Sequence, residues 1–99
     1  MSGRQPLLLD AKALPRGEEL RIELSDYRGF TYIGLRKWYR NGEGWAPGKG
    51  LSLRATMIPY LRQALEHAEA EALRLGLLDE EAYESCGLPI PPEILGEAA

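Results

Sequence analysis

The feature that most constrains the fold is a pair of segments separated by a glycine turn. In residues 20–25, leucine or isoleucine alternates with a polar side chain, which is typical of a half-buried strand. Residues 30–39 are rich in aromatic and β-branched side chains and predict a second strand. Arg28-Gly29 lies between them and can turn the chain tightly, because glycine accepts a positive φ. We therefore expect two consecutive strands joined by a tight turn.

Weaker strand signals lie on both sides of this pair. Residues 7–14 predict a first strand, and Pro15-Arg16-Gly17 predicts the turn after it. After Arg36 the alternation becomes ambiguous, and we expect a β-bulge there that re-aims the side chains. The chain beyond is expected to be irregular at residues 41–44 and 47–50 and to continue into a short strand at residues 51–53.

The pattern then changes to a helical period. Apolar residues recur every three or four positions, at Ile58, Leu61, Leu65, Ala68, Ala72 and Leu75. With Thr56 as the N-cap and Gly76 as the C-terminal stop, this predicts a helix of about 20 residues. Asp79 is expected to cap a short second helix at residues 80–85, and the chain from Gly87 onward to be extended and mobile.

These elements predict an α+β fold. Ninety-nine residues fit one small domain with a modest core, so dimerisation would help to bury apolar surface. The expected organisation is a flexible N-terminus at residues 1–6, a sheet-plus-helix domain at residues 7–76 and an acidic, proline-containing extension at residues 77–99. The candidate dimer contacts are the apolar helix residues Ile58, Leu61, Leu65 and Ala68.

Charge is distributed unevenly along the chain. Residues 20–54 carry seven basic and three acidic side chains, whereas residues 55–99 carry two basic and nine acidic ones. The basic stretch also holds six aromatic residues, namely Tyr27, Phe30, Tyr32, Trp38, Tyr39 and Trp45. Cations bind phosphates and flat rings stack on unpaired bases, so this combination predicts a platform for single-stranded nucleic acid.

Some of these rings are expected to be core residues, because aromatic side chains in strands usually pack inside. Tyr27 lies beside the turn, Tyr39 lies at a strand end next to Arg40, and Trp45 is expected in a glycine-rich loop. A core explains these three positions less well. Arg40 and Trp45 are therefore candidate nucleic-acid contacts on the basis of their chemistry.

Catalytic and metal chemistry is not expected. His67 is the only histidine and Cys86 the only cysteine, so neither a zinc ligand set nor a Ser-His-Asp arrangement can be assembled. The segment around Lys49 departs from a phosphate-binding P-loop in its spacing. No apolar run approaches the roughly 18 residues that span a membrane. We expect a soluble cytoplasmic protein with no cofactor and no enzymatic activity.

Three segments together resemble a known family. They are residues 20–29 (LRIELSDYRG), 32–39 (YIGLRKWY) and 47–53 (PGKGLSL). Their sequence and order are similar to those of the transcriptional coactivator family of positive cofactor four (p15-type), and the resemblance covers about residues 7–75. Eukaryotic members carry a Ser-rich segment before the domain, and without it the chain looks more like the prokaryotic or phage members.

The resemblance implies a fold and a site. It implies a curved four-stranded antiparallel sheet followed by a long amphipathic helix, in a homodimer that holds single-stranded DNA or the melted halves of a duplex. The positions that match the family's base-stacking rings are Tyr27 and Tyr39. The positions that match its backbone-binding cations are Arg28, Arg36 and Lys49.

Residue chemistry and resemblance lead to one interpretation and two alternatives. The chain is expected to bind single-stranded DNA with little sequence specificity, in transcription regulation or in handling melted DNA during replication or repair. A location at the nucleoid is expected if the source is prokaryotic, and no partner in the transcription machinery can be named. An RNA-binding protein and a protein-interaction module that binds no nucleic acid both remain open.

Overall fold

The computed structural model of the chain describes residues 7–96. The N-terminus that was expected to be flexible, residues 1–6, and the last residues of the acidic extension lie outside this range. The chain divides into two compact units, Met1–Ile58 and Pro59–Ala99. The first unit contains the strands β1 (Leu7–Ala13), β2 (Glu18–Tyr27), β3 (Phe30–Asn41) and β4 (Gly44–Arg54), with 3-10 turns η1 (Pro15–Gly17) and η2 (Ala55–Met57).

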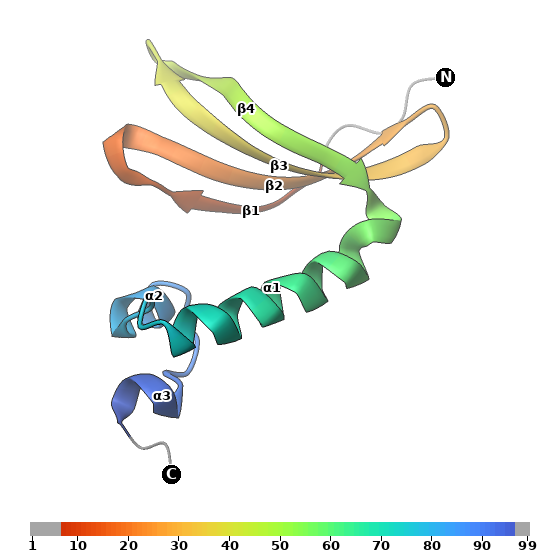
Figure 1. Ribbon diagram of the computed structural model, residues 1–99. Helices are drawn as coiled ribbons and strands as arrows, with labels where there is room; N and C mark the ends of the chain where they lie inside the picture. Colours follow the sequence, from red (N-terminus) through yellow and green to blue (C-terminus); the bar gives the residue numbers. More distant parts are fainter. Residues whose placement is uncertain (1–6, 97–99) are drawn as a thin grey trace. The chain divides into compact units, whose positions relative to one another are not determined.

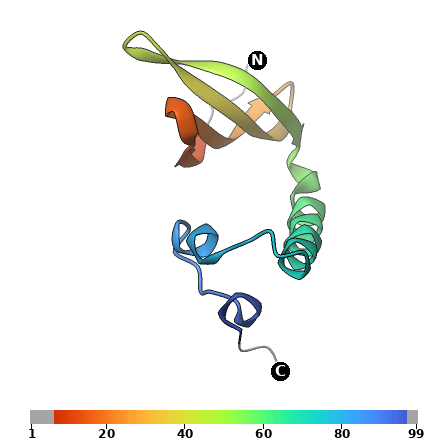
Figure 2. The same cartoon turned by 60° about the vertical axis from the view of Figure 1, so that its left-hand side comes forward.

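The four strands form one antiparallel sheet in the order β1-β2-β3-β4. Every strand therefore pairs with its neighbour in the sequence, and Figure 1 shows that the sheet is curved. The long β3–β4 hairpin is visibly twisted in the second view (Figure 2). The predicted α+β fold, a four-stranded antiparallel sheet followed by a long helix, is confirmed.

The predicted turn between the two strongest strands is confirmed in detail. Tyr27 pairs with Phe30, so Arg28 and Gly29 alone connect β2 to β3. Their φ values are 53° and 83°, and positive φ at both central residues is the mark of a type I′ hairpin turn. Glycine adopts this conformation without strain, whereas arginine rarely does. The turn therefore presents the Arg28 side chain at the tip of a hairpin at some conformational cost.

The loop expected at residues 41–44 is a turn of two residues, Gly42 and Glu43, and the expectation of irregular chain at residues 47–50 is wrong. β4 runs without interruption from Gly44 to Arg54, and only Gly42 and Glu43 separate it from β3. Pro47 and the glycines argue against a central strand, but β4 is an edge strand and pairs only with β3. An edge strand tolerates proline and glycine because one side of its backbone needs no strand partner.

The second unit contains the helices α1 (Ile58–Arg74, whose first residue ends the first unit), α2 (Glu80–Glu84) and α3 (Pro92–Leu95). α1 ends as predicted at Gly76, whose φ is 72°. The Leu77 amide donates to the Ala72 carbonyl at 2.9 Å and the Gly76 amide to the Leu73 carbonyl at 3.1 Å, which is a Schellman cap. Thr56 is not the N-cap, because it lies inside η2, where the backbone is already helical.

The chain after α1 is more ordered than expected. Asp79 caps α2 as predicted, and its Oδ1 accepts a hydrogen bond from the Ala82 amide at 3.0 Å. The expectation of an extended tail from Gly87 onward is wrong, because Pro92–Leu95 forms α3. Proline is favoured in the first turn of a helix, where its missing N–H has no intrahelical partner to lose.

Burial is sparse throughout the described range. Tyr83 of α2, with 6% of its surface exposed, is the single buried residue within residues 7–96. The Tyr83 hydroxyl donates a hydrogen bond to the Glu69 carboxylate of α1, inside the second unit. No strand residue is buried. The apolar side of the sheet therefore lacks the enclosed core that normally stabilises a small domain.

Candidate nucleic-acid interface

The strand register assigns the side chains of the sheet to two faces. Directly paired residues lie on the same face, and successive residues of a strand alternate between faces. Arg21 pairs with Arg36, Ser25 with Tyr32, and Arg40 with Trp45. One side, which we call the aromatic face, includes Arg21, Ser25, Tyr27, Phe30, Tyr32, Arg36, Trp38, Arg40, Trp45, Ser52 and Arg54. Two acidic residues of β2, Glu19 and Glu23, lie on this face as well. The other side, the aliphatic face, includes Leu20, Ile22, Leu24, Ile33, Leu35, Tyr39, Leu51 and Leu53, together with the charged residues Glu18 and Lys37.

Arginines and rings are interleaved at one end of the aromatic face. The Arg21 guanidinium carbon lies 4.3 Å from the centre of the Trp38 ring and 5.3 Å from the centre of the Trp45 ring. The Arg40 guanidinium carbon lies 5.2 Å from the centre of the Trp45 ring. We call these four residues the Arg–Trp ladder. The Trp38 indole N–H is buried and has no hydrogen-bond partner among the described residues.

A second group of stacked arginines lies toward the β2–β3 turn. Arg54 lies 3.6 Å from the centre of the Phe30 ring and 5.9 Å from the centre of the Tyr32 ring. Arg28 lies 5.2 Å from the centre of the Tyr27 ring. A guanidinium that stacks on a ring keeps its N–H groups directed outward in its own plane. Such arginines can therefore contact phosphates while they remain stacked.

A β-bulge lies at the predicted level of the sheet, but its extra residue is in β4 and not in β3, where it was expected, and the bulge carries Lys49. The register of β3 and β4 shifts between Arg36 and Trp38, because Gly48 and Lys49 together face the single residue Lys37. Arg36 Nη1 donates a hydrogen bond to the Gly48 carbonyl oxygen at 2.9 Å. The Arg36 side chain thus holds the bulge in place, and this structural role comes in addition to any role in binding.

A bulky residue does not fit next to this bulge. A Cβ atom added to Gly50 would lie 2.7 Å from the Arg36 Cβ and 2.8 Å from the Leu35 carbonyl oxygen. Both distances are shorter than real Cβ contacts, and the carbonyl belongs to the backbone. Glycine at this position therefore allows β3 and β4 to approach closely enough to form the bulge.

Tyr39 does not share a face with the other predicted rings. It pairs with Glu18 in β2 and Ala46 in β4, which places it on the aliphatic face, whereas Tyr27 and Trp45 lie on the aromatic face. Its side chain is 46% exposed, and its ring lies next to Gly48 of the bulge. Tyr39 and Lys49 therefore lie near the β4 edge.

The structure brings most of the other predicted contacts together. Arg36, Arg40 and Trp45 lie on the aromatic face with Tyr27, and Arg28 lies in the adjoining turn. Trp45 was expected in a loop, and the structure instead pairs it with Arg40 inside β4. Within residues 7–96, no carboxylate lies within ion-pair distance of the predicted cations Arg28, Arg36, Arg40 and Lys49. Arg21, by contrast, is paired with Glu19 at 2.7 Å.

The candidate contacts did not include part of this face. The additional residues are Arg21, Ser25, Phe30, Tyr32, Trp38, Ser52 and Arg54. Phe30, Tyr32 and Trp38 had been counted among the rings of the basic stretch without being assigned a contact. A signal was present for Tyr32, because the alternation in β3 already places it on the same face as Arg36. Ser52 and Arg54 join this face only through the register across the bulge, which no local pattern specifies.

A family model described as Transcriptional Coactivator p15 (PC4) matches residues 14–64, about half of the chain. The chain belongs to this family. The match confirms the resemblance inferred from the three sequence segments, and no curated protein or solved structure gives a significant match.

The PC4 match covers β2, β3, β4 and the start of α1. All seven residues predicted to bind nucleic acid therefore lie inside the PC4 region, whereas β1, most of α1, α2 and α3 lie outside it. In the described part of the chain, no cluster of three or more His, Cys, Asp or Glu side chains has a geometry that would hold a metal ion. None of the described helices has the length and apolar character required to cross a membrane.

Proposed function

We propose that this PC4-family chain binds single-stranded DNA with little sequence specificity. The observation that carries the proposal is the interleaving of arginines and aromatic rings on one face of an open sheet. Backbone phosphates would contact the outward N–H groups of the stacked arginines and release counterions. Bases would stack on exposed rings, and stacking requires that they be unpaired. Neither contact depends strongly on base identity.

The bound DNA strand would follow the aromatic face of the sheet and leave it at the β4 edge. Tyr27, 58% exposed, offers a stacking surface beside the turn, and Trp45 offers one within the Arg–Trp ladder. Tyr39 and Lys49 near the bulge would contact the DNA where it passes around the β4 edge. Arg28 and Arg40 would contact the phosphates. This path uses six of the seven predicted contacts although they do not share one face, and the seventh, Arg36, holds the bulge that carries Lys49.

We also propose that the chain acts as a homodimer. The aliphatic face contains no buried residue, and Leu51 within it is 54% exposed. On α1, Ile58 is 37% and Leu65 is 66% exposed, and Ala68 is exposed as well. Apolar surface of this extent favours association, because burying it gains about 25 cal/mol per Å². A second copy, with Leu61 and its neighbours in the contact, is the occupant that the family resemblance supports.

The family description supports a role in transcription. We propose a non-enzymatic cytoplasmic protein, associated with the nucleoid if the source is prokaryotic, that regulates transcription or protects melted DNA. A coactivator of this kind is expected to contact the transcription machinery, and the family description supports that expectation without identifying the component.

The decisive experiment is a titration of labelled oligonucleotides followed by fluorescence anisotropy. Single-stranded DNA, the matched duplex and the matched RNA are compared at several salt concentrations. We expect the tightest binding to single-stranded DNA. The logarithm of the affinity should fall linearly as the logarithm of the salt concentration rises. Equal or tighter binding to RNA would favour the RNA-binding alternative. Failure to bind any nucleic acid would leave only the protein-interaction module.

A further inference from the structure

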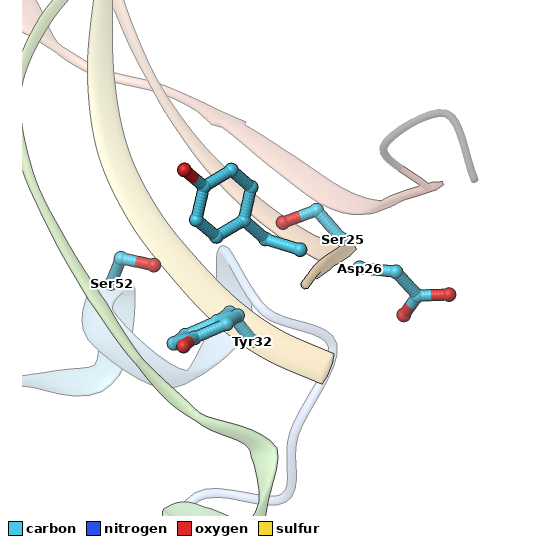
Figure 3. A pocket seen from close by; sticks show the side chains of 5 residues that line it. Ser25, Asp26, Tyr32 and Ser52 are labelled. Atoms are coloured by element: carbon cyan, nitrogen blue, oxygen red, sulfur yellow. The ribbon is translucent and has the colours of Figure 1, made fainter. Parts of the chain in front are cut away.

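A pocket lies on the aromatic face beside the β2–β3 turn. Its volume is ≈ 440 Å³, and it is lined by Ser25, Asp26, Tyr27, Tyr32 and Ser52. Figure 3 shows the hydroxyls of Ser25 and Ser52 directed toward the space between them, while the Asp26 carboxylate points away from it. Asp26 is instead held by the Thr31 hydroxyl, which donates a hydrogen bond to its Oδ1 at 2.8 Å.

Four lining residues of this pocket, Ser25, Tyr27, Tyr32 and Ser52, each carry a hydroxyl. None of these four hydroxyls has a hydrogen-bond partner among residues 7–96. A hydroxyl can donate one hydrogen bond and accept two, and its hydrogen rotates to suit the partner. The pocket therefore offers two flat rings together with hydrogen-bonding groups that adapt to a polar edge.

The chemistry of the lining favours a neutral, flat, polar-edged ligand. Among residues 7–96, no Lys or Arg lines the pocket, so its described lining offers hydroxyls and rings and no cation to hold a phosphate. Cations lie just outside it instead. Arg28 is stacked on Tyr27, and Arg54 lies 5.9 Å from the centre of the Tyr32 ring. A nucleobase inside the pocket would thus have stacked arginines nearby for the phosphates on either side of it.

We propose that this pocket takes one unpaired nucleobase of the bound strand and reads its edge through the hydroxyls of Ser25 and Ser52. The inference rests on the proposed function and adds to it. Elsewhere on the face, bases stack without being distinguished, whereas here hydrogen bonds make affinity depend on the edge presented. Tyr32 contributes both a ring and a hydroxyl to this single base site.

The test compares the parent chain with the Ser25→Ala/Ser52→Ala double variant. Both are titrated with homopolymers of dA, dC, dG and dT of equal length, and with a strand of equal length whose sugars carry no bases. For the best-bound homopolymer we expect the variant to lose about tenfold in affinity, as for two neutral hydrogen bonds. The differences among homopolymers should shrink, while the affinity for the base-free strand and the salt slope should not change.

The controls separate this inference from the proposed function. Ser85→Ala removes a hydroxyl from the second unit, and we expect it to bind like the parent. Should the double variant melt early, the single serine variants and Tyr32→Phe serve in its place. If a folded double variant still binds strongly and ranks the homopolymers by affinity as the parent does, the base site is overturned. The proposed binding of single-stranded DNA would still stand. A parent chain that binds no single strand would overturn the proposed function and the base site together.

Discussion

At the scale of single residues, Arg28 combines a conformational cost to folding with a proposed gain in binding. Its φ of 53° lies in the left-handed region, which favours asparagine and glycine over arginine. Arg28→Asn creates the Asn-Gly sequence preferred in type I′ turns. We expect the melting temperature to stay equal or to rise, while the slope of log affinity against log salt shrinks by about 0.7 for one lost phosphate contact. Thermal melting and salt-dependent anisotropy measure the two effects separately.

The result for Arg28→Asn is informative in both directions. A fall in melting temperature would show that the arginine side chain stabilises the hairpin, for example through its contact with the Tyr27 ring. An unchanged salt slope in a folded variant would remove Arg28 from the proposed phosphate contacts.

Substitutions of Tyr27 and Tyr39 test whether the bound DNA passes around the β4 edge. They lie on opposite faces of the sheet, at 58% and 46% exposure. If both stack on bases, Tyr27→Ala and Tyr39→Ala each lower affinity by about 1–3 kcal/mol without changing the salt slope. Tyr60→Ala, which removes an exposed ring from α1, serves as the control. Normal binding by a folded Tyr39→Ala variant would show that the DNA stays on the aromatic face.

At the scale of elements, the bulge in β4 depends on Gly50. Gly50→Ala places a methyl group against the Arg36 Cβ and the Leu35 carbonyl. We expect a loss of stability of about 1–3 kcal/mol, as for other overpacked sites, together with weaker binding, because the bulge carries Lys49. The matched control is Gly44→Ala in the same strand, where an added Cβ meets nothing within 4 Å. Denaturant unfolding of the two variants makes the comparison, and equal stabilities would contradict the close approach.

The contact between α1 and α2 predicts a dependence of stability on alkaline pH. The hydrogen bond to Glu69, followed by burial and the negative charges of Glu69 and Glu93, raises the pKa of Tyr83 to about 12. In the unfolded chain the tyrosine pKa is about 10. The unfolded state therefore loses its proton first, so this stabilisation is complete below about pH 10 and is lost as pH rises toward 12.

Tyr83→Phe tests this linkage. We expect the helical signal of the parent to melt at progressively lower temperature between pH 10 and 12, and the Tyr83→Phe variant to show a flatter dependence. Tyr60→Phe removes the hydroxyl of an exposed tyrosine on α1 and should behave like the parent. Parallel curves for the parent and Tyr83→Phe would rule out this source of pH dependence.

Local patterns predicted much of the fold but less of the site. Period-two alternation, the Arg28-Gly29 turn and the stop at Gly76 are all encoded within a few neighbouring residues, and the structure has them where they were expected. The first part of β4, before the predicted strand at residues 51–53, was missed because proline and glycine disfavour strands in general, and only its position at the edge makes them acceptable. The pocket was missed because Ser25 and Ser52 share a face only through pairing with β3.

At the scale of the whole molecule, charge separates the two units. Residues 77–99 carry six acidic and no basic side chains. A chain truncated after Gly76 should still form a dimer, because the candidate contacts on α1 remain. Its affinity for single-stranded DNA at low salt should be equal or higher, because negative charge that repels phosphate has been removed. Sedimentation and anisotropy test both expectations, and a large loss of binding or folding would make α2 and α3 part of the functional domain.

The Arg–Trp ladder also gives the protein an internal optical reporter. The chain contains two tryptophans, Trp38 and Trp45, and both belong to the ladder on the aromatic face. Indole emission responds to stacked bases and to neighbouring guanidinium groups, so its intensity should follow events at this end of the sheet. The helical second unit carries no tryptophan and contributes nothing to this signal. Occupancy of one surface can therefore be followed on the unlabelled native chain.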